Sequence, residues 1–165
     1  MFQLKPLSQE AIPAALAKAE RYRLLNEPAE AESICLDILE VQPDNQQALV
    51  MLLLALADQF DEGRPAKDAE DVIPRLKDEY ERAYYAGILC ERRAKALHNR
   101  GGLGSGFLAY DWFRKAMTWY EKAEQLRPRG NDDALLRWNA CARLLLRNPQ
   151  LEPLPEERAE PVLSE

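Results

Sequence analysis

Few side chains in this sequence combine the residue types and the spacing that catalysis requires. His98 is the only histidine, and it falls at the expected end of a long helix, where such a side chain is favourable for structural reasons. Glu91, Arg92, Arg93 and Lys95 could exchange protons, but the sequence supplies no nucleophile beside them. We interpret this cluster as the solvated face of a helix. An enzyme that uses His98 and these neighbouring charges is the less favoured alternative.

The cysteines and the glycine-rich segment point to structural roles. Cys35, Cys90 and Cys141 are odd in number and far apart, which fits a reducing compartment better than a disulfide framework. None has a partner at metal-ligand spacing, so we expect small core residues. The segment 101–106 (Gly-Gly-Leu-Gly-Ser-Gly) follows no strand and precedes no Lys-Ser or Lys-Thr, so it predicts a turn and not a phosphate loop. We expect no cofactor and no metal.

Size and charge narrow the class of protein further. The chain has 165 residues, 47% of them hydrophobic, which suits one domain with a continuous core. The net charge is −6, and residues 150–165 carry −4 of it. The remaining body is only mildly acidic, without the basic face of a nucleic-acid-binding protein. The longest apolar run, Ala48 to Ala57, is far shorter than the roughly 18 residues of a membrane span. The first residues of this sequence do not show a basic segment followed by an apolar stretch and a cleavage site, so we expect no secretory leader. We therefore expect a cytoplasmic protein that binds neither nucleic acid nor membrane.

Helix formers dominate the sequence, and a repeat organises them. Leu, Ala, Glu and Arg are frequent and β-branched residues rarely cluster, so the propensities favour helix along almost the whole chain. Two segments carry apolar residues at the same distances before a proline: Ala31, Cys35 and Ile38 before Pro43, and Ala116, Tyr120 and Ala123 before Pro128. Each segment is typical of the second helix of a helical hairpin.

A period of about 34 residues relates these segments. Counting back from Pro43 places unit starts at Ile12, Gln46 and Tyr80, and a fourth start at Asn131 leaves an insertion within the third unit. We expect the insertion to form a long hairpin with helices over 80–99 and 107–127. Gly87 occupies the same position in the third unit as Ala19 does in the first. A small residue is expected at this position because it lets the two helices of a hairpin cross closely. The spacing predicts that Ala19 meets Ala31 and that Gly87 meets Ala116.

Together these residues resemble a divergent tetratricopeptide repeat protein over residues 9–147. The residues that carry the resemblance are Ala19, Tyr22, Ala31 and Pro43, then Gly87, Ala116, Tyr120, Ala123 and Pro128. The usual tryptophan of the motif is replaced by Ala15, Leu49, Ala83 and Ala134. The second unit fits least well, since Pro74 should kink or end its second helix.

The resemblance implies an all-α fold, a right-handed superhelical stack of about three helix hairpins with a C-terminal capping helix. One domain would span residues 1–148, with units near 12–45, 46–79 and 80–130 and the capping helix at 131–147. Residues 149–165 combine prolines with glutamates, so we expect a disordered acidic tail.

The resemblance also implies a concave groove lined by the first helix of each unit. Its residues mix apolar anchors with both signs of charge, which suits a peptide or a helix of another protein. We therefore predict a non-catalytic adaptor or scaffold. The predicted groove residues are Leu16, Glu20, Arg23, Val50, Leu54, Asp58, Tyr84, Ile88, Glu91, Arg92, Leu135, Asn139 and Arg143.

A second surface leaves an alternative function open. The expected helix over 107–127 has an apolar arc wider than the stripe that a surface helix typically buries. Either its own neighbours cover the arc, or the outer turns bury against another subunit. In the second case Phe107, Tyr110, Trp112 and Phe113 form an oligomer surface, and the protein is a self-associating structural subunit.

Overall fold

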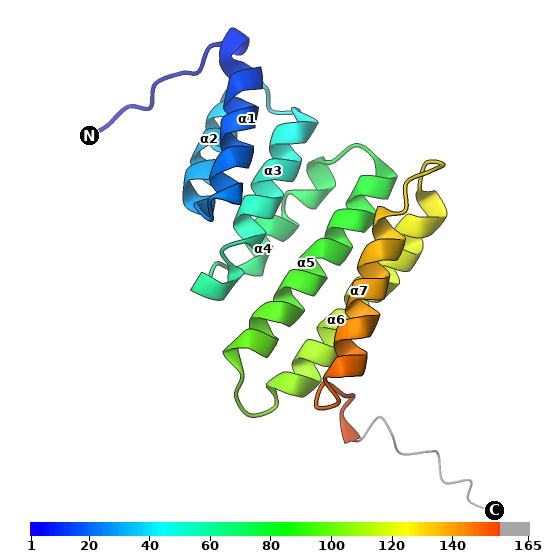
Figure 1. Ribbon diagram of the computed structural model, residues 1–165. Coiled ribbons are helices and arrows are strands. Elements are labelled where there is room, and N and C mark those ends of the chain that lie inside the picture. The colour runs from blue at the N-terminus through cyan, green and yellow to red at the C-terminus, as the bar shows by residue number, and fades with distance from the viewer. Residues whose placement is uncertain (156–165) are drawn as a thin grey trace, which may run out of the picture.

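The computed structural model describes residues 1–155, and this part of the chain is all-helical (Figure 1). Seven α-helices and three short 3-10 turns are present, and no strand occurs among these residues. The prediction of an all-α fold is confirmed. The helices are α1 (Ile12–Leu24), α2 (Pro28–Val41), α3 (Gln46–Ala57), α4 (Ala66–Glu70), α5 (Glu79–Arg100), α6 (Ser105–Leu126) and α7 (Asp133–Arg147), and the 3-10 turns are Gln9–Ala11, Phe60–Glu62 and Ile73–Arg75.

Local chemistry sets the ends of the helices. Asn26 has a positive φ of 60° after α1, and Pro28 begins α2, as the tolerance of Asn for left-handed backbone and of Pro for a first turn predicts. The Asn45 side chain accepts a hydrogen bond of 2.9 Å from the Ala48 amide and caps α3. Gly101 and Gly104 also have positive φ. The glycine turn therefore separates two long helices of 22 residues each.

The second helix of the second pair is cut short. α4 spans 5 residues, and the chain then passes through the turn Ile73–Arg75, which contains Pro74. Proline lacks an amide hydrogen and crowds the preceding turn, so the helix cannot continue through it.

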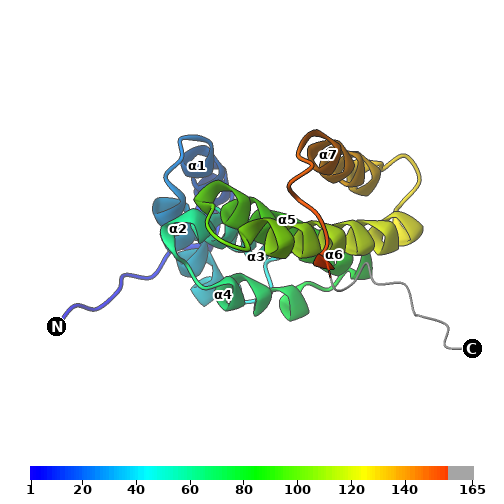
Figure 2. The ribbon, with the colours of Figure 1, turned by 90° about the horizontal axis from the view of Figure 1, so that it is seen from below.

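Successive helices pack side by side (Figures 1 and 2). Two hydrophobic clusters share α5. α2 lies against α1 and α3, and α6 lies against α5 and α7. The first cluster is built mainly by α1 to α4 and includes Leu89 and Ala96 of α5. The second cluster is built by α5, α6 and α7 and includes Ala83 and Ala94 of α5. The position of α5 therefore fixes how the two halves meet.

The second cluster extends past residue 148, where the sequence placed the end of the domain. Leu151 is only 4% exposed and belongs to this cluster. The Gln150 carbonyl oxygen would lie 2.8 Å from a Cβ atom at Gly106, so the close approach requires a glycine there. Residues 156–165, most of the predicted disordered tail, lie outside the described residues.

Gly87 brings α5 and α6 close together. A Cβ atom at this position would lie 2.6 Å from Cε1 and 2.7 Å from Cδ1 of Tyr120. Tyr120 is one turn beyond Ala116, the neighbour that the repeat predicted. The Tyr120 ring is fully buried, so it has little room to move away.

We expect Gly87→Ala to lower the free energy of unfolding by about 1–3 kcal/mol, because the added methyl group overpacks this contact. Urea unfolding followed by circular dichroism measures the change. In a Tyr120→Leu background the same substitution should cost less, since the ring is gone. Stabilisation by about 1 kcal/mol, the usual result for glycine replaced in an unobstructed helix, would contradict the contact.

Candidate functional site

The face formed by α1, α3, α5 and α7 contains two clefts, and about half of the predicted groove residues line them. The first cleft has a volume of about 450 Å³ and the second about 380 Å³. The first cleft is lined by Leu16, Ala17, Glu20, Gln46, Gln47, Val50, Met51, Glu81 and Tyr85. The second is lined by Ala57, Asp58, Phe60, Asp61, Ile88, Glu91, Arg92, Lys95, Asn99 and Arg137.

The first cleft combines apolar walls with two carboxylates. Leu16, Val50 and Tyr85 provide the walls, and Glu20 and Glu81 provide the charge. Within residues 1–155 neither carboxylate has an ion-pair partner. Burial, and then the charge of Asp78, raises the pKa of Glu81 above its ordinary value. The cleft is therefore apolar, negatively charged and open to a cationic group.

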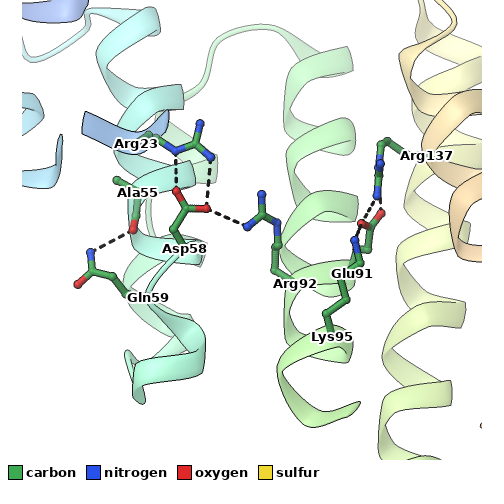
Figure 3. A network of polar contacts seen from close by, with 8 residues as sticks. All are labelled: Arg23, Ala55, Asp58, Gln59, Glu91, Arg92, Lys95 and Arg137. Carbon is green, nitrogen blue, oxygen red and sulfur yellow. Dashed lines mark hydrogen bonds and ion pairs between the residues drawn. The ribbon is translucent and has the colours of Figure 1, made fainter. Parts of the chain in front are cut away.

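An ion-paired network borders the second cleft and joins three helices (Figure 3). Asp58, which follows α3, accepts hydrogen bonds of 2.7 and 3.2 Å from Arg23 of α1. It accepts a third, of 2.8 Å, from Arg92 of α5. The Asp58 side chain is only 16% exposed. Because one carboxylate accepts hydrogen bonds from two guanidinium groups on different helices, this network holds α1, α3 and α5 in register.

Glu91 is the most deeply buried charge in the described chain, with its side chain 3% exposed. It accepts two hydrogen bonds from Arg137 of α7, one from Nε at 3.2 Å and one from Nη2. It accepts another from Lys95 at 2.6 Å. The Tyr120 hydroxyl donates to it at 3.0 Å and the Cys141 thiol at 3.4 Å.

The environment keeps Glu91 ionised. Burial opposes the charge, but the hydrogen bonds and charges of Arg137 and Lys95 outweigh it, so the pKa of Glu91 lies below its ordinary value. The sequence interpretation placed Glu91 on a solvated, partner-facing surface. The structure corrects this, since its carboxylate is occupied within the fold.

The other predicted groove residues separate into three groups. Leu54 is partly buried and packs against the first cluster. Tyr84 packs among the rings of Tyr80, Tyr85 and Tyr120, with centroids 5.1–5.9 Å from its own. The α7 residues Leu135, Asn139 and Arg143 line neither cleft.

Several residues of the clefts were not predicted. Met51 and Tyr85 directly follow the predicted Val50 and Tyr84. Including the residue after each predicted groove position would therefore have found them. Lys95 and Arg137 reach the second cleft because they pair with Glu91. Arg137 lies 46 residues from Glu91, and the sequence contains no local feature that links the two.

The predicted oligomer surface is only partly available. Phe113 is 0% exposed and belongs to the second cluster, so it contributes to no surface. Trp112 lies beneath Arg93 and Lys115, with cation-to-ring distances of 3.7 and 4.2 Å. Phe107 and Tyr110 are half-buried. The aromatic arc of α6 is therefore largely used within the chain.

The cysteines and His98 are the side chains here that most often act as nucleophiles or proton carriers in enzymes. Burial raises the pKa of Cys35 and of Cys141 to about 12 and that of Cys90 to about 11, so the nucleophilic thiolate is scarce near neutral pH. His98 is half-buried and lines neither cleft. Among residues 1–155 no group of three His, Cys, Asp or Glu residues could hold a metal ion.

Comparison with known proteins gives no assignment. No protein-family model matches the chain, and neither a curated protein nor a solved structure matches it significantly. Within the described part of the chain, no helix combines the length and the apolar character needed to cross a bilayer.

We expect Asp58→Asn to lower the free energy of unfolding by about 1–2 kcal/mol, because Arg23 and Arg92 lose a partly buried partner. Thermal and urea unfolding measure the loss. Asp61→Asn is the matched control: Asp61 is exposed and has no ion pair among the described residues, so it should change stability by less than about 0.5 kcal/mol. Equal effects of the two substitutions would show that the network does not hold the helices.

We expect Glu91→Gln to cost about 2–4 kcal/mol at pH 7, because it removes a buried charge from its partners. The folded-state pKa of Glu91 is lowered, so this stabilisation is present above the unfolded pKa, near 4.5, and is lost as pH falls through the folded pKa. Urea unfolding at pH 7, and then at decreasing pH below 4.5, should therefore show the free energies of unfolding of wild type and Glu91→Gln converging. Glu81→Gln is the control with the opposite shift, and it should not destabilise the protein at pH 7. A difference between wild type and Glu91→Gln that is independent of pH would contradict the assignment.

Proposed function

We propose that this protein is a non-catalytic adaptor or scaffold that binds a segment of another protein along the face formed by α1, α3, α5 and α7. The observation that carries the proposal is the first cleft, where side chains that pack only in part against the first cluster line an open apolar wall. Beside this wall, the carboxylates of Glu20 and Glu81 have no ion-pair partner within residues 1–155. Its volume of about 450 Å³ lies within the range of specific binding pockets. An apolar anchor beside a cation is the chemistry that fits it.

The second cleft supports the proposal as a polar extension of the first. Asp58 and Glu91 are already paired with arginines, so they stabilise the face and do not require an external cation. Asp61 and Asn99 are exposed at the same cleft and can form hydrogen bonds with a bound backbone. The first cleft therefore anchors the bound segment, and the second cleft positions its backbone.

We further propose that the fold is a stack of tetratricopeptide-like hairpins. On this interpretation α1–α2, α3–α4 and α5–α6 are the three hairpins, and α7 is the capping helix. The sequential packing of the helices and the close contact at Gly87 support it. Cys35, Cys90 and Cys141 form no disulfide among residues 1–155, which suits the cytoplasmic location that we infer.

Selection of displayed random peptides on the immobilised protein tests the proposed function. We expect enriched peptides to carry an aliphatic or aromatic residue next to Lys or Arg, since these groups fill the first cleft. Calorimetric titration of an enriched peptide should show at least tenfold weaker binding to Val50→Glu, which places a charge on the apolar wall.

Leu136→Glu is the control for this titration, because Leu136 is 60% exposed on α7 and lines neither cleft. Circular dichroism first confirms that both variants are folded. The proposed function fails if no peptide is enriched, or if enriched peptides bind Val50→Glu as tightly as wild type.

A further inference from the structure

Residues 1–8 form an extended arm that leaves the helical body (Figure 1). Phe2 is 100% exposed and Leu4 is 87% exposed, although both are large apolar side chains. Leu7 packs against the first cluster and anchors the base of the arm beside the turn Gln9–Ala11. The base of the arm is thus fixed, and no side chain within residues 1–155 covers its apolar surface.

The chemistry of the arm matches the first cleft. Side chains two residues apart lie on the same side of an extended chain, so Phe2 and Leu4 can enter an apolar cleft together. Lys5 is exposed and precedes Pro6, which keeps its backbone extended. The arm therefore offers two apolar groups and a cation. The cleft offers apolar walls and the carboxylates of Glu20 and Glu81, which no cation within residues 1–155 pairs with.

The direction of the arm favours the cleft of another molecule over its own. In both ribbon views the arm extends away from the helices (Figures 1 and 2). The cleft lies between α1, α3 and α5, and its residues on α1 begin at Leu16, more than a turn into the helix. An arm that leaves in this direction presents Phe2 and Leu4 to a neighbouring molecule.

We propose that the arm of one copy of this chain occupies the first cleft of a second copy. Phe2 and Leu4 pack against Leu16, Val50 and Tyr85. Lys5 starts on the opposite side of the extended arm, and its long side chain turns back toward the carboxylates of Glu20 and Glu81. Reciprocal exchange closes the contact into a two-fold dimer. The inference uses the same cleft as the proposed function and names a resident occupant for it, which a binding partner displaces.

Sedimentation equilibrium of the whole chain over a range of concentrations is the first test. Wild type should rise above the monomer mass of 18.9 kDa as concentration increases. Phe2→Ser combined with Leu4→Ser should weaken the dimer at least about a hundredfold, because two buried apolar side chains are lost. Lys18→Glu is the control, since Lys18 is exposed on α1 and does not line the cleft.

A charge exchange separates this contact from every other mode of dimerisation. Lys5→Glu opposes the acidic cleft, and Glu20→Lys with Glu81→Gln opposes the native arm, so each variant alone should associate more weakly than wild type by about fivefold at low salt. Mixing the two variants pairs each arm with a cleft of opposite charge. The mixture should regain the wild-type dissociation constant as a heterodimer.

Three results would overturn the inference. The first is a wild-type chain that remains at 18.9 kDa at every concentration, which includes the case of an arm that folds into its own cleft. The second is a dimer that Phe2→Ser with Leu4→Ser leaves intact, which would place the contact elsewhere, for example on the exposed part of α6. The third is a mixture of charge variants that associates no better than its components. Peptide selection on the Phe2→Ser, Leu4→Ser variant judges the proposed function separately from all three.

Discussion

The buried carboxylate of Glu91 is the interaction on which the arrangement of the helices depends. A charge removed from water must be satisfied by several donors, and this one receives them from Lys95 on its own helix, Tyr120 on α6, and Arg137 and Cys141 on α7. The next residue, Arg92, reaches across to Asp58 at the end of α3. Two consecutive residues of α5 thus direct one network into each half of the molecule. Neither half can shift along α5 without breaking charged hydrogen bonds.

This division of charge also shapes the open face. Where carboxylates pair with arginines, as at Asp58, these groups hold the helices together. Glu20 and Glu81 pair with no cation within residues 1–155, so the first cleft keeps negative charge beside its apolar walls. Interfaces gain specificity from such local complementarity more than from total area. The molecule therefore separates the charges that position its helices from the charges available for recognition.

The sequence predicted those features that local chemistry determines. Asn26 with Pro28, Pro74 and the glycine turn each act within a few residues, and the helices end or break at them as expected. The burial of Glu91 was beyond sequence reasoning, because its donors Tyr120 and Arg137 are 29 and 46 residues away. Glutamate on a helix is usually solvated, so the role of Glu91 becomes clear only from the donors that surround it in the folded structure. For Phe113 the sequence left two alternatives open, an oligomer surface or burial by neighbouring helices, because only packing across helices could decide between them; Phe113 is buried in the second cluster.

The cysteines give the two halves separate internal reporters. Cys35 lies in the first hydrophobic cluster and Cys141 in the second, and both thiols are shielded from solvent and held protonated. An alkylating reagent reaches either one only during a local opening of its own half. The relative labelling rates of the two thiols therefore report whether the halves open together, as one cooperative unit, or independently on either side of α5.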